Sequence, residues 1–121
     1  MTEVLPIQDK VLQESACLQC GVKYSQGLMA YAAYSNGKIV GICQFSINDN
    51  GAIITDLSNA FGINNEKILF IIARAVLNFI DLCGIRFPKC ESKNIDEALI
   101  KRIGFSKNSD GIYEIDLGHF L

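Results

Sequence analysis

An acidic residue interrupts one of the most apolar stretches of this 121-residue chain. Asp56 stands in the stretch AIITDLS, whose other residues favour a strand. A carboxylate in such a strand is costly to bury unless it has partners. Asp56 could therefore serve as a general base that accepts a proton from an amine. The alternative is that Asp56 faces solvent or caps the end of the strand.

The five cysteines offer a second set of reactive groups. Cys17 and Cys20 form a CxxC pair, but zinc would need two further ligands, and neither a second CxxC nor a pair of histidines is present. The pair also lies at the C-terminal end of an expected helix, whereas redox pairs open a helix. We therefore expect these two thiols to be structural and predict no metal site. Cys43, Cys83 and Cys90 stand in apolar surroundings, where cysteine packs as a small hydrophobic side chain.

A third candidate is the turn that leads into the longest expected helix, GINNEKILFIIARAVL at residues 62–77. A helix that begins just after a strand is a common place for a phosphate, because its free N–H groups and its dipole point toward the anion. Such a turn needs small residues, which let the backbone approach the phosphate. The chain has no glycine-rich loop of the P-loop or dinucleotide-binding type.

The elements that would position these residues form one domain over residues 1–121, because the chain has no repeat, low-complexity stretch or linker. Periodicity and turn signals predict an antiparallel meander, followed by a strand–helix–strand parallel crossover. The expected elements are a helix over 8–20, strands over 28–35, 38–47 and 52–58, a helix over 65–82, a strand over 87–91, a helix over 97–103 and a strand over 112–117.

Two of these elements predict further details. Asn-Gly at 36–37 favours a two-residue hairpin turn that places Tyr34 opposite Ile39 and Ala32 opposite Gly41. The helix over 65–82 is apolar on most of its surface, so it should lie on a sheet and be covered again by another element or a second subunit. Together with the small residues of the first strand, this makes a homodimer one expected arrangement.

This order of elements resembles that of the GNAT family of N-acetyltransferases over all but the first 27 residues. The most specific part is ESKNIDEALIKRIGFSKNSDGIYEIDL at residues 91–117, with Asn94, the pair Gly104-Phe105 and an alternating last strand. The hairpin sequence NGKIVGICQFSI is also similar to the second hairpin of that family. The resemblance implies an α+β fold, with a mixed and mostly antiparallel sheet that carries helices on both faces.

In that family an acyl group moves from a coenzyme A thioester to an amine, and the cofactor's pyrophosphate sits at the start of the long helix. The family's loop has the pattern Arg/Gln-x-x-Gly-x-Gly/Ala, which aligns with residues 64–69 of this chain. Asn64, Lys67 and Leu69 occupy its three defined positions, and none of them matches. Glu66 adds a negative charge there, although Lys67 could offer a positive one. The resemblance therefore implies a degenerate cofactor motif.

The resemblance also assigns candidate site residues. Asp56 would be the base, whereas the position of the family's tyrosine acid is occupied by Ile100. The cofactor candidates are residues expected beside the pantetheine chain or the phosphates, namely Leu57, Asn59, Phe61 and Lys67.

The composition of the chain argues against nucleic acid and membrane as partners. Charged residues make up 20% of the chain and the formal net charge is −2, which argues against general nucleic-acid binding. The longest purely apolar stretch, residues 68–73, is far shorter than the ~20 residues of a spanning helix. The N-terminus lacks the basic start and apolar core of a signal peptide, so we expect a cytoplasmic protein.

Two functions from different classes follow. The first is a divergent GNAT-like domain, without ordinary acetyl-CoA-dependent catalysis, that acts as a small ligand-binding or protein-interaction module and has no assured cofactor. The alternative is an active N-acetyltransferase that uses acetyl-CoA to acylate a small amine, with Asp56 as the base.

Overall fold

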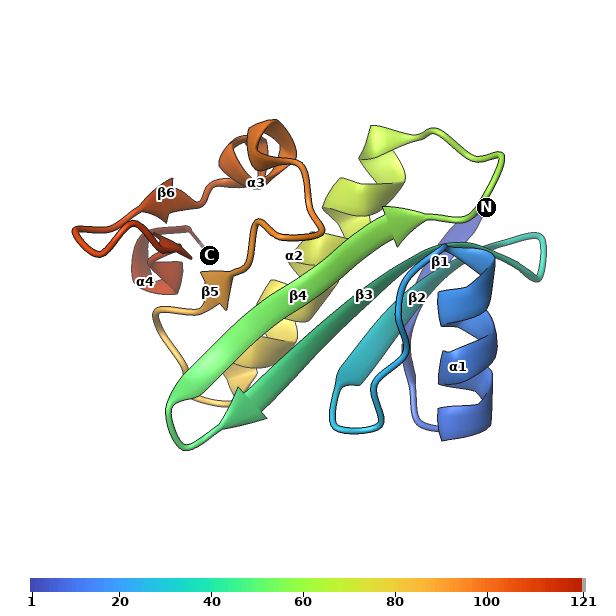
Figure 1. The fold of residues 1–121 in the computed structure, drawn as a ribbon, viewed down its shortest axis with the longest axis horizontal. Coiled ribbons are helices and arrows are strands. Elements are labelled where there is room, and N and C mark those ends of the chain that lie inside the picture. Colours follow the sequence, from blue (N-terminus) through green and yellow to red (C-terminus); the bar gives the residue numbers. More distant parts are fainter. Residues whose placement is uncertain (121) are drawn as a thin grey trace.

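A seven-stranded sheet runs through the computed structural model, which describes residues 1–120. The strands lie in the order β1-β2-β3-β4-β5-β7-β6, and the β4–β5 pair is parallel whereas the other neighbours are antiparallel (Figure 1). The strands are β1 (Thr2–Ile7), β2 (Met29–Ser35), β3 (Lys38–Asn48), β4 (Gly51–Asn59), β5 (Lys89–Cys90), β6 (Ser106–Lys107) and β7 (Tyr113–Glu114). The helices are α1 (Lys10–Gln19), α2 (Glu66–Leu82), α3 (Glu97–Ile103) and α4 (Leu117–Phe120).

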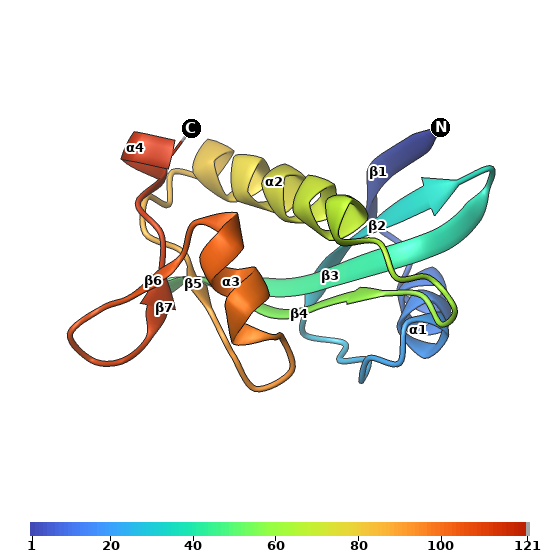
Figure 2. The ribbon, with the colours of Figure 1, turned by 90° about the horizontal axis from the view of Figure 1, so that it is seen from above.

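The long helix α2 and the N-terminal helix α1 lie on opposite faces of the sheet (Figure 2). On the α2 side, Ile72, Val76 and Ile80 are fully buried in the larger core cluster with Phe45 and Ile54. A smaller cluster, which includes Ala16, Cys17, Ala32 and Ile42, fills the α1 side. This arrangement confirms the expected α+β fold, with a mixed, mostly antiparallel sheet and helices on both faces.

Several local predictions hold. Both residues of the turn at 36–37 adopt positive φ, 53° and 78°, and Tyr34 pairs with Ile39 as expected. The helix over 97–103 begins and ends where the sequence predicts, with the Asp96 side chain as its N-cap. No helix among residues 1–120 is both long and apolar enough to cross a membrane.

Other expectations were wrong in their extent. The strands β1 and β6 were not predicted from the sequence, and the last strand is limited to Tyr113–Glu114 instead of 112–117. The polar stripe of α2 is exposed as the periodicity requires, but Ile71 and Leu82 are exposed too, so the outer side of this helix stays at the surface of the chain.

The expected partner of Gly41 was also wrong. Gly41 pairs with Ala33, not Ala32, because the register shifts after Tyr34 and leaves Val40 as an extra residue on β3. Such a β-bulge increases the local twist of the strand. Below this bulge α2 comes unusually close to the sheet: a Cβ atom on Gly41 would lie 2.9 Å from Cδ1 of Ile72 and 3.3 Å from a carbonyl oxygen of β4.

Gly41→Ala should therefore destabilise the protein by about 1–3 kcal/mol, because the new methyl group forces α2 away from β3. Urea unfolding of the variant measures this free energy. Gly27→Ala is the matched control, since its methyl group would meet nothing within 4 Å, and we expect a change within about 0.5 kcal/mol. Equal effects of the two substitutions would show that the contact between Gly41 and Ile72 does not limit the approach of α2.

Candidate functional site

The strands β4 and β5 pair over a short distance and then separate. Ile53 and Ile54 pair with Lys89 and Cys90, and one further bond joins the Glu91 N–H to the Ile54 carbonyl oxygen at 2.9 Å. Beyond that bond, residues 55–59 of β4 continue toward the start of α2 without β5 beside them (Figure 1).

A groove of about 390 Å³ lies along this free end of β4, and we call it the β4–β5 groove. Its wall is formed by the end of β4 and the loop at 60–63, together with Leu69 of α2 and Leu99 of α3. Three of the four cofactor candidates, Leu57, Asn59 and Phe61, line the groove, whereas Lys67 does not. The groove therefore stands where the resemblance places the pantetheine chain.

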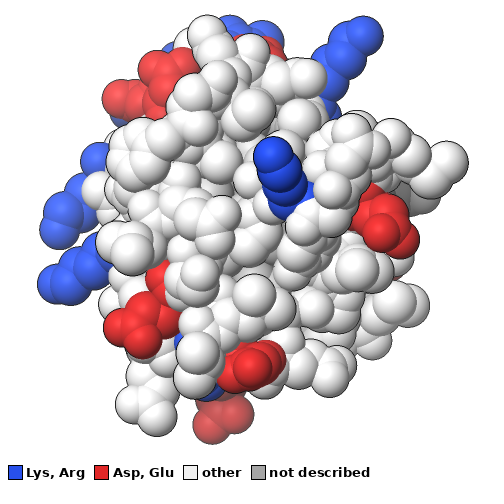
Figure 3. Space-filling view, turned by 90° about the vertical axis from the view of Figure 1, so that its right-hand side faces the viewer, with Lys and Arg blue, Asp and Glu red and all other residues white. Residues whose placement is uncertain are grey.

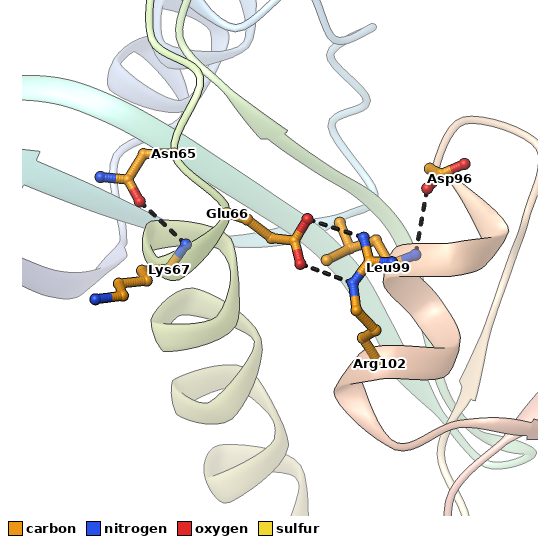
Figure 4. A network of polar contacts seen from close by, with 6 residues as sticks. All are labelled: Asn65, Glu66, Lys67, Asp96, Leu99 and Arg102. Carbon is orange, nitrogen blue, oxygen red and sulfur yellow. Dashed lines mark hydrogen bonds and ion pairs between the residues drawn. The ribbon is translucent and has the colours of Figure 1, made fainter.

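The start of α2 is closed by its own side chains. Asn65 Oδ1 accepts a hydrogen bond from the backbone N–H of Lys67 at 3.0 Å (Figure 4). It accepts a second one from the N–H of Ile68 at 3.4 Å. Asn59 and Asn65 are joined by two more bonds of 3.2 Å, one of which occupies the Asn65 N–H. Three donors that an anion would use at this helix end are thus already bonded. Lys67 points to the other side of the helix from Glu66 (Figure 4).

An ion pair connects α2 with α3 beside this helix start. Arg102 donates from two nitrogens to the two carboxylate oxygens of Glu66, both at 2.8 Å (Figure 4). Glu66 precedes Leu69 by three residues and Arg102 follows Leu99 by three, so the ion pair lies on the helix faces that line the groove. Both side chains are about half exposed. The hydrogen bond to Glu66 raises the pKa of Arg102 further, so the guanidinium stays charged.

Asp56 does not face solvent, so that alternative was wrong. Its side chain is buried, and Oδ2 accepts hydrogen bonds from Gln44 Nε2 at 3.0 Å and from Thr55 Oγ1 at 2.9 Å. Oδ1 has a single long bond, 3.4 Å from Asn94 Nδ2. Among the described residues no lysine or arginine forms an ion pair with it. Within residues 1–120 the Asp56 carboxylate is therefore held by neutral donors alone.

A bulge on β4 turns Asp56 toward these donors. Gln44 pairs with Asp56 and Phe45 pairs with Ile54, which leaves Thr55 as an extra residue. Side chains alternate along a strand, so in a regular strand without a bulge Asp56 would share the face of Ile54, inside the apolar core under α2. The bulge instead places Asp56 on the α1 face.

Gln44 connects Asp56 to the N-terminal helix. Its Oε1 accepts hydrogen bonds from Gln13 Nε2 at 3.0 Å and Cys17 Sγ at 3.2 Å, and its Nε2 also donates to the Lys23 carbonyl oxygen at 2.9 Å. Gln13 and Gln44 are both fully buried. Neither residue was predicted from the sequence, although Gln44 stands between apolar neighbours in ICQFSI, which is the same kind of signal as Asp56 in AIITDLS.

The cysteines behave as structural groups, with one exception. Burial raises the pKa of Cys17 to about 11 and that of Cys20 to about 12, so both remain protonated near neutral pH. Cys43 and Cys90 are buried as expected, but Cys83 is exposed, because it lies just after the end of α2. Among the described residues, no group of three or more side chains could hold a metal ion.

The tyrosine acid of the family has no equivalent at the expected place. Ile100 is fully buried in the core. Tyr113 is the nearest phenol in sequence, but its ring is buried and its hydroxyl donates to Glu97, which raises its pKa to about 12. Lys107 lies over the same ring, 5.4 Å from its centroid. These contacts assign Tyr113 to the packing of α3 against β7.

Gln44→Met should destabilise the protein by about 2–3 kcal/mol, because it removes the shared partner of buried donors and acceptors while it keeps most of the side-chain volume. Urea unfolding measures the loss. Gln26→Met is the control: Gln26 is exposed in the loop after α1, and a change within about 0.5 kcal/mol is expected. An unchanged free energy of unfolding for Gln44→Met would contradict this prediction and would mean that water replaces the hydrogen bonds of the amide without loss of stability.

Comparisons with known proteins agree on the architecture. No family model matches the sequence, and the curated proteins contain no significant match. A GNAT-family acetyltransferase from Desulfovibrio desulfuricans superposes with a TM-score of 0.74 at 13% identity, over 97% of this chain and 99% of that one. The ribosomal-protein-S18-alanine N-acetyltransferase of Escherichia coli gives 0.70 at 10% identity, over 94% and 89% of the two chains.

A third structure carries a ligand. YhhK of Escherichia coli, described as an N-acetyl transferase and solved with coenzyme A bound, gives a TM-score of 0.68 at 10% identity, over 96% of this chain and 98% of that one. At these identities a structural likeness concerns the fold and not the chemistry. This chain has the fold of the GNAT N-acetyltransferases.

Proposed function

We propose that this protein is a divergent GNAT-fold domain that does not hold coenzyme A in the ordinary way and acts as a small ligand-binding or protein-interaction module. The observation that carries the proposal is the closed start of α2, where the Asn65 side chain occupies the N–H groups of Lys67 and Ile68. A pyrophosphate would need those donors.

A phosphate could bind the N–H groups at the start of α2 only if it displaced the Asn65 side chain, and several interactions make this displacement unfavourable. Loss of a helix N-cap costs about 1 kcal/mol. The carboxylate of Glu66 stands in the same turn and would repel the anion. Leu69 is buried and cannot give way to a phosphate without loss of core packing. These costs support a degenerate cofactor motif, as the resemblance implied at residues 64–69.

The surface of the protein supports the interaction module. A shallow groove of about 670 Å³ lies between α1, the β2–β3 hairpin and the loop at 60–63, and we call it the hairpin groove. Its exposed apolar side chains include Leu12, Phe61 and Ile63, and Phe61 is 76% exposed. Figure 3 shows that the face containing the hairpin tip carries few charges around its middle, apart from one basic side chain. Exposed apolar side chains that gather in a groove with few charges around it support an interface there.

We propose a second copy of the chain as the partner at the hairpin groove, so that the module is a homodimer.

The five free cysteines support a cytoplasmic setting, because thiols stay reduced there.

An active N-acetyltransferase is the second candidate function. It is favoured by the open β4–β5 groove and by the buried Asp56, which has no cationic partner among the described residues. In that case acetyl-CoA would lie along Leu57, Asn59 and Phe61. The ammonium group of Lys67 would contact a phosphate from the side of the helix. Asp56 would accept a proton from the amine.

A thermal melt with coenzyme A tests the proposed function. We expect no change in Tm with about 1 mM coenzyme A or acetyl-CoA, whereas a ligand at about 100 times its Kd would add about 2.7 kcal/mol and several degrees. YhhK, which was solved with coenzyme A, is the positive control under the same conditions. The double variant Asn65→Gly/Lys67→Gly, which frees the blocked N–H groups, should gain a measurable shift.

A clear shift for the unmodified protein would contradict the proposal and favour the acetyltransferase. Amine acceptors would then be assayed with Asp56→Asn, which keeps the shape of the side chain. Its amide oxygen can still accept from Gln44 and Thr55, while its amide nitrogen requires the Asn94 amide to turn and present its oxygen. Loss of turnover without a lower Tm would support Asp56 as the base, and unchanged turnover would exclude it.

Sedimentation velocity tests the homodimer. The sedimentation coefficient should rise with protein concentration in the micromolar range, and Phe61→Gln should weaken this association because Phe61 stands in the hairpin groove. Phe87→Gln is the matched control, since Phe87 is also exposed but does not line that groove. A monomer at every concentration would end the dimer proposal.

A further inference from the structure

Part of the sheet face opposite α2 has no helix against it. The helix α1 contacts β1 and β3, toward the opposite edge of the sheet from β5 and β7 (Figure 2). Along β4 and β5 the side chains of Ile54 and Cys90 are buried under α2. Alternation therefore turns Ile53 and Lys89 to the other face.

A pocket of about 480 Å³ occupies this open face, and we call it the β5 pocket. Its volume lies within the ~300–1,000 Å³ typical of small-molecule sites. Ile53 of β4 and Ile112, just before β7, supply apolar walls, and Ile112 is 41% exposed. Three charged residues, Lys89, Glu91 and Lys93, also line it. Apolar walls with a few charged groups suit a ligand that has an apolar body and one charged end.

The two lysines have no partner among the described residues. Neither forms a hydrogen bond or an ion pair there, although Glu114 lies directly opposite Lys89 on the neighbouring strand. Lys89 is half-buried and lines the pocket, but its ammonium group has no hydrogen bond or ion pair within residues 1–120. An anion in the pocket would supply that contact.

We propose that the β5 pocket binds a small carboxylate with an apolar body. Lys89 and Lys93 hold the carboxylate, and Ile53 and Ile112 hold the body. Among the residues that line the pocket, two lysines and Glu91 sum to one positive charge, which favours a monoanion over a dianion such as a phosphate monoester. The inference goes beyond the proposed function, because none of these residues belongs to the β4–β5 groove.

Hexanoate is a suitable probe for an NMR titration of the ¹⁵N-labelled full chain at constant ionic strength. Hexanamide, which has the same body and no charge, is titrated in parallel. We expect saturable shifts of the amides around the β5 pocket, with a Kd of about 1–10 mM for hexanoate and at least about tenfold weaker binding of hexanamide.

Two double variants remove the same total charge. Lys89→Gln/Lys93→Gln should weaken hexanoate binding at least about tenfold, whereas Lys23→Gln/Lys101→Gln, on exposed lysines outside the pocket, should leave it within about twofold. If the first double variant does not fold, the exposed Lys93→Gln alone should weaken binding.

Three results would overturn the inference: no saturable shifts with hexanoate, equal binding of hexanamide, or equal weakening by both double variants. Any of these outcomes leaves the coenzyme A measurement unaffected. Conversely, coenzyme A binding at the start of α2 would leave the carboxylate site standing.

Discussion

Each polar group inside this sheet needs a partner, and Gln44 meets that requirement for three separate elements. Its amide joins Gln13 of α1, the backbone after α1 and Asp56 of β4. No buried side-chain nitrogen or oxygen atom among the described residues lacks a partner. The α1 layer contains few large apolar side chains, so this network fixes the position of the helix where packing alone is thin. In a low-dielectric interior such a network specifies one arrangement, because any shift leaves a donor or acceptor unpaired.

The two ends of the β4–β5 region show how a fold can keep its architecture while a local site changes. The strands separate beyond Ile54, as they must if a chain-like ligand is to lie between them. The helix that begins above this opening is nevertheless capped by Asn65 and tied to α3 through Glu66 and Arg102. The opening depends on strand pairing, which involves much of the core. The anion site depends on a few side chains in one turn, which can change without disturbing the sheet. A fold is therefore weaker evidence for a ligand than the turn that would hold it.

The parts of the structure that the sequence predicted depend on local signals. Asn65 and Asp96 precede apolar helices, and both are N-caps. Asn-Gly at 36–37 forms its turn because both residues tolerate positive φ. The bonds between residues far apart in the sequence were not predictable in this way. Gln13 and Gln44 are 31 residues apart, and Glu66 and Arg102 are 36 apart. Neither pair has a spacing that reveals it, since only the folded sheet brings the partners together.

The bulges explain why register was harder to predict than the presence of strands. A regular alternation would have placed Asp56 on the same face as Ile54, in contact with the α2 core. One extra residue, Thr55, reverses the face for the rest of β4. The Thr55 hydroxyl also donates a hydrogen bond to Asp56. The extra residue of the bulge therefore supplies one of the hydrogen bonds that the carboxylate accepts. The acidic residue in AIITDLS is therefore tolerated, because the bulge at Thr55 turns the next side chain, Asp56, away from the apolar face of the strand. Ile53 precedes the bulge and alternates with Ile54 onto the open side of the sheet, and β4 thus contributes to two cavities.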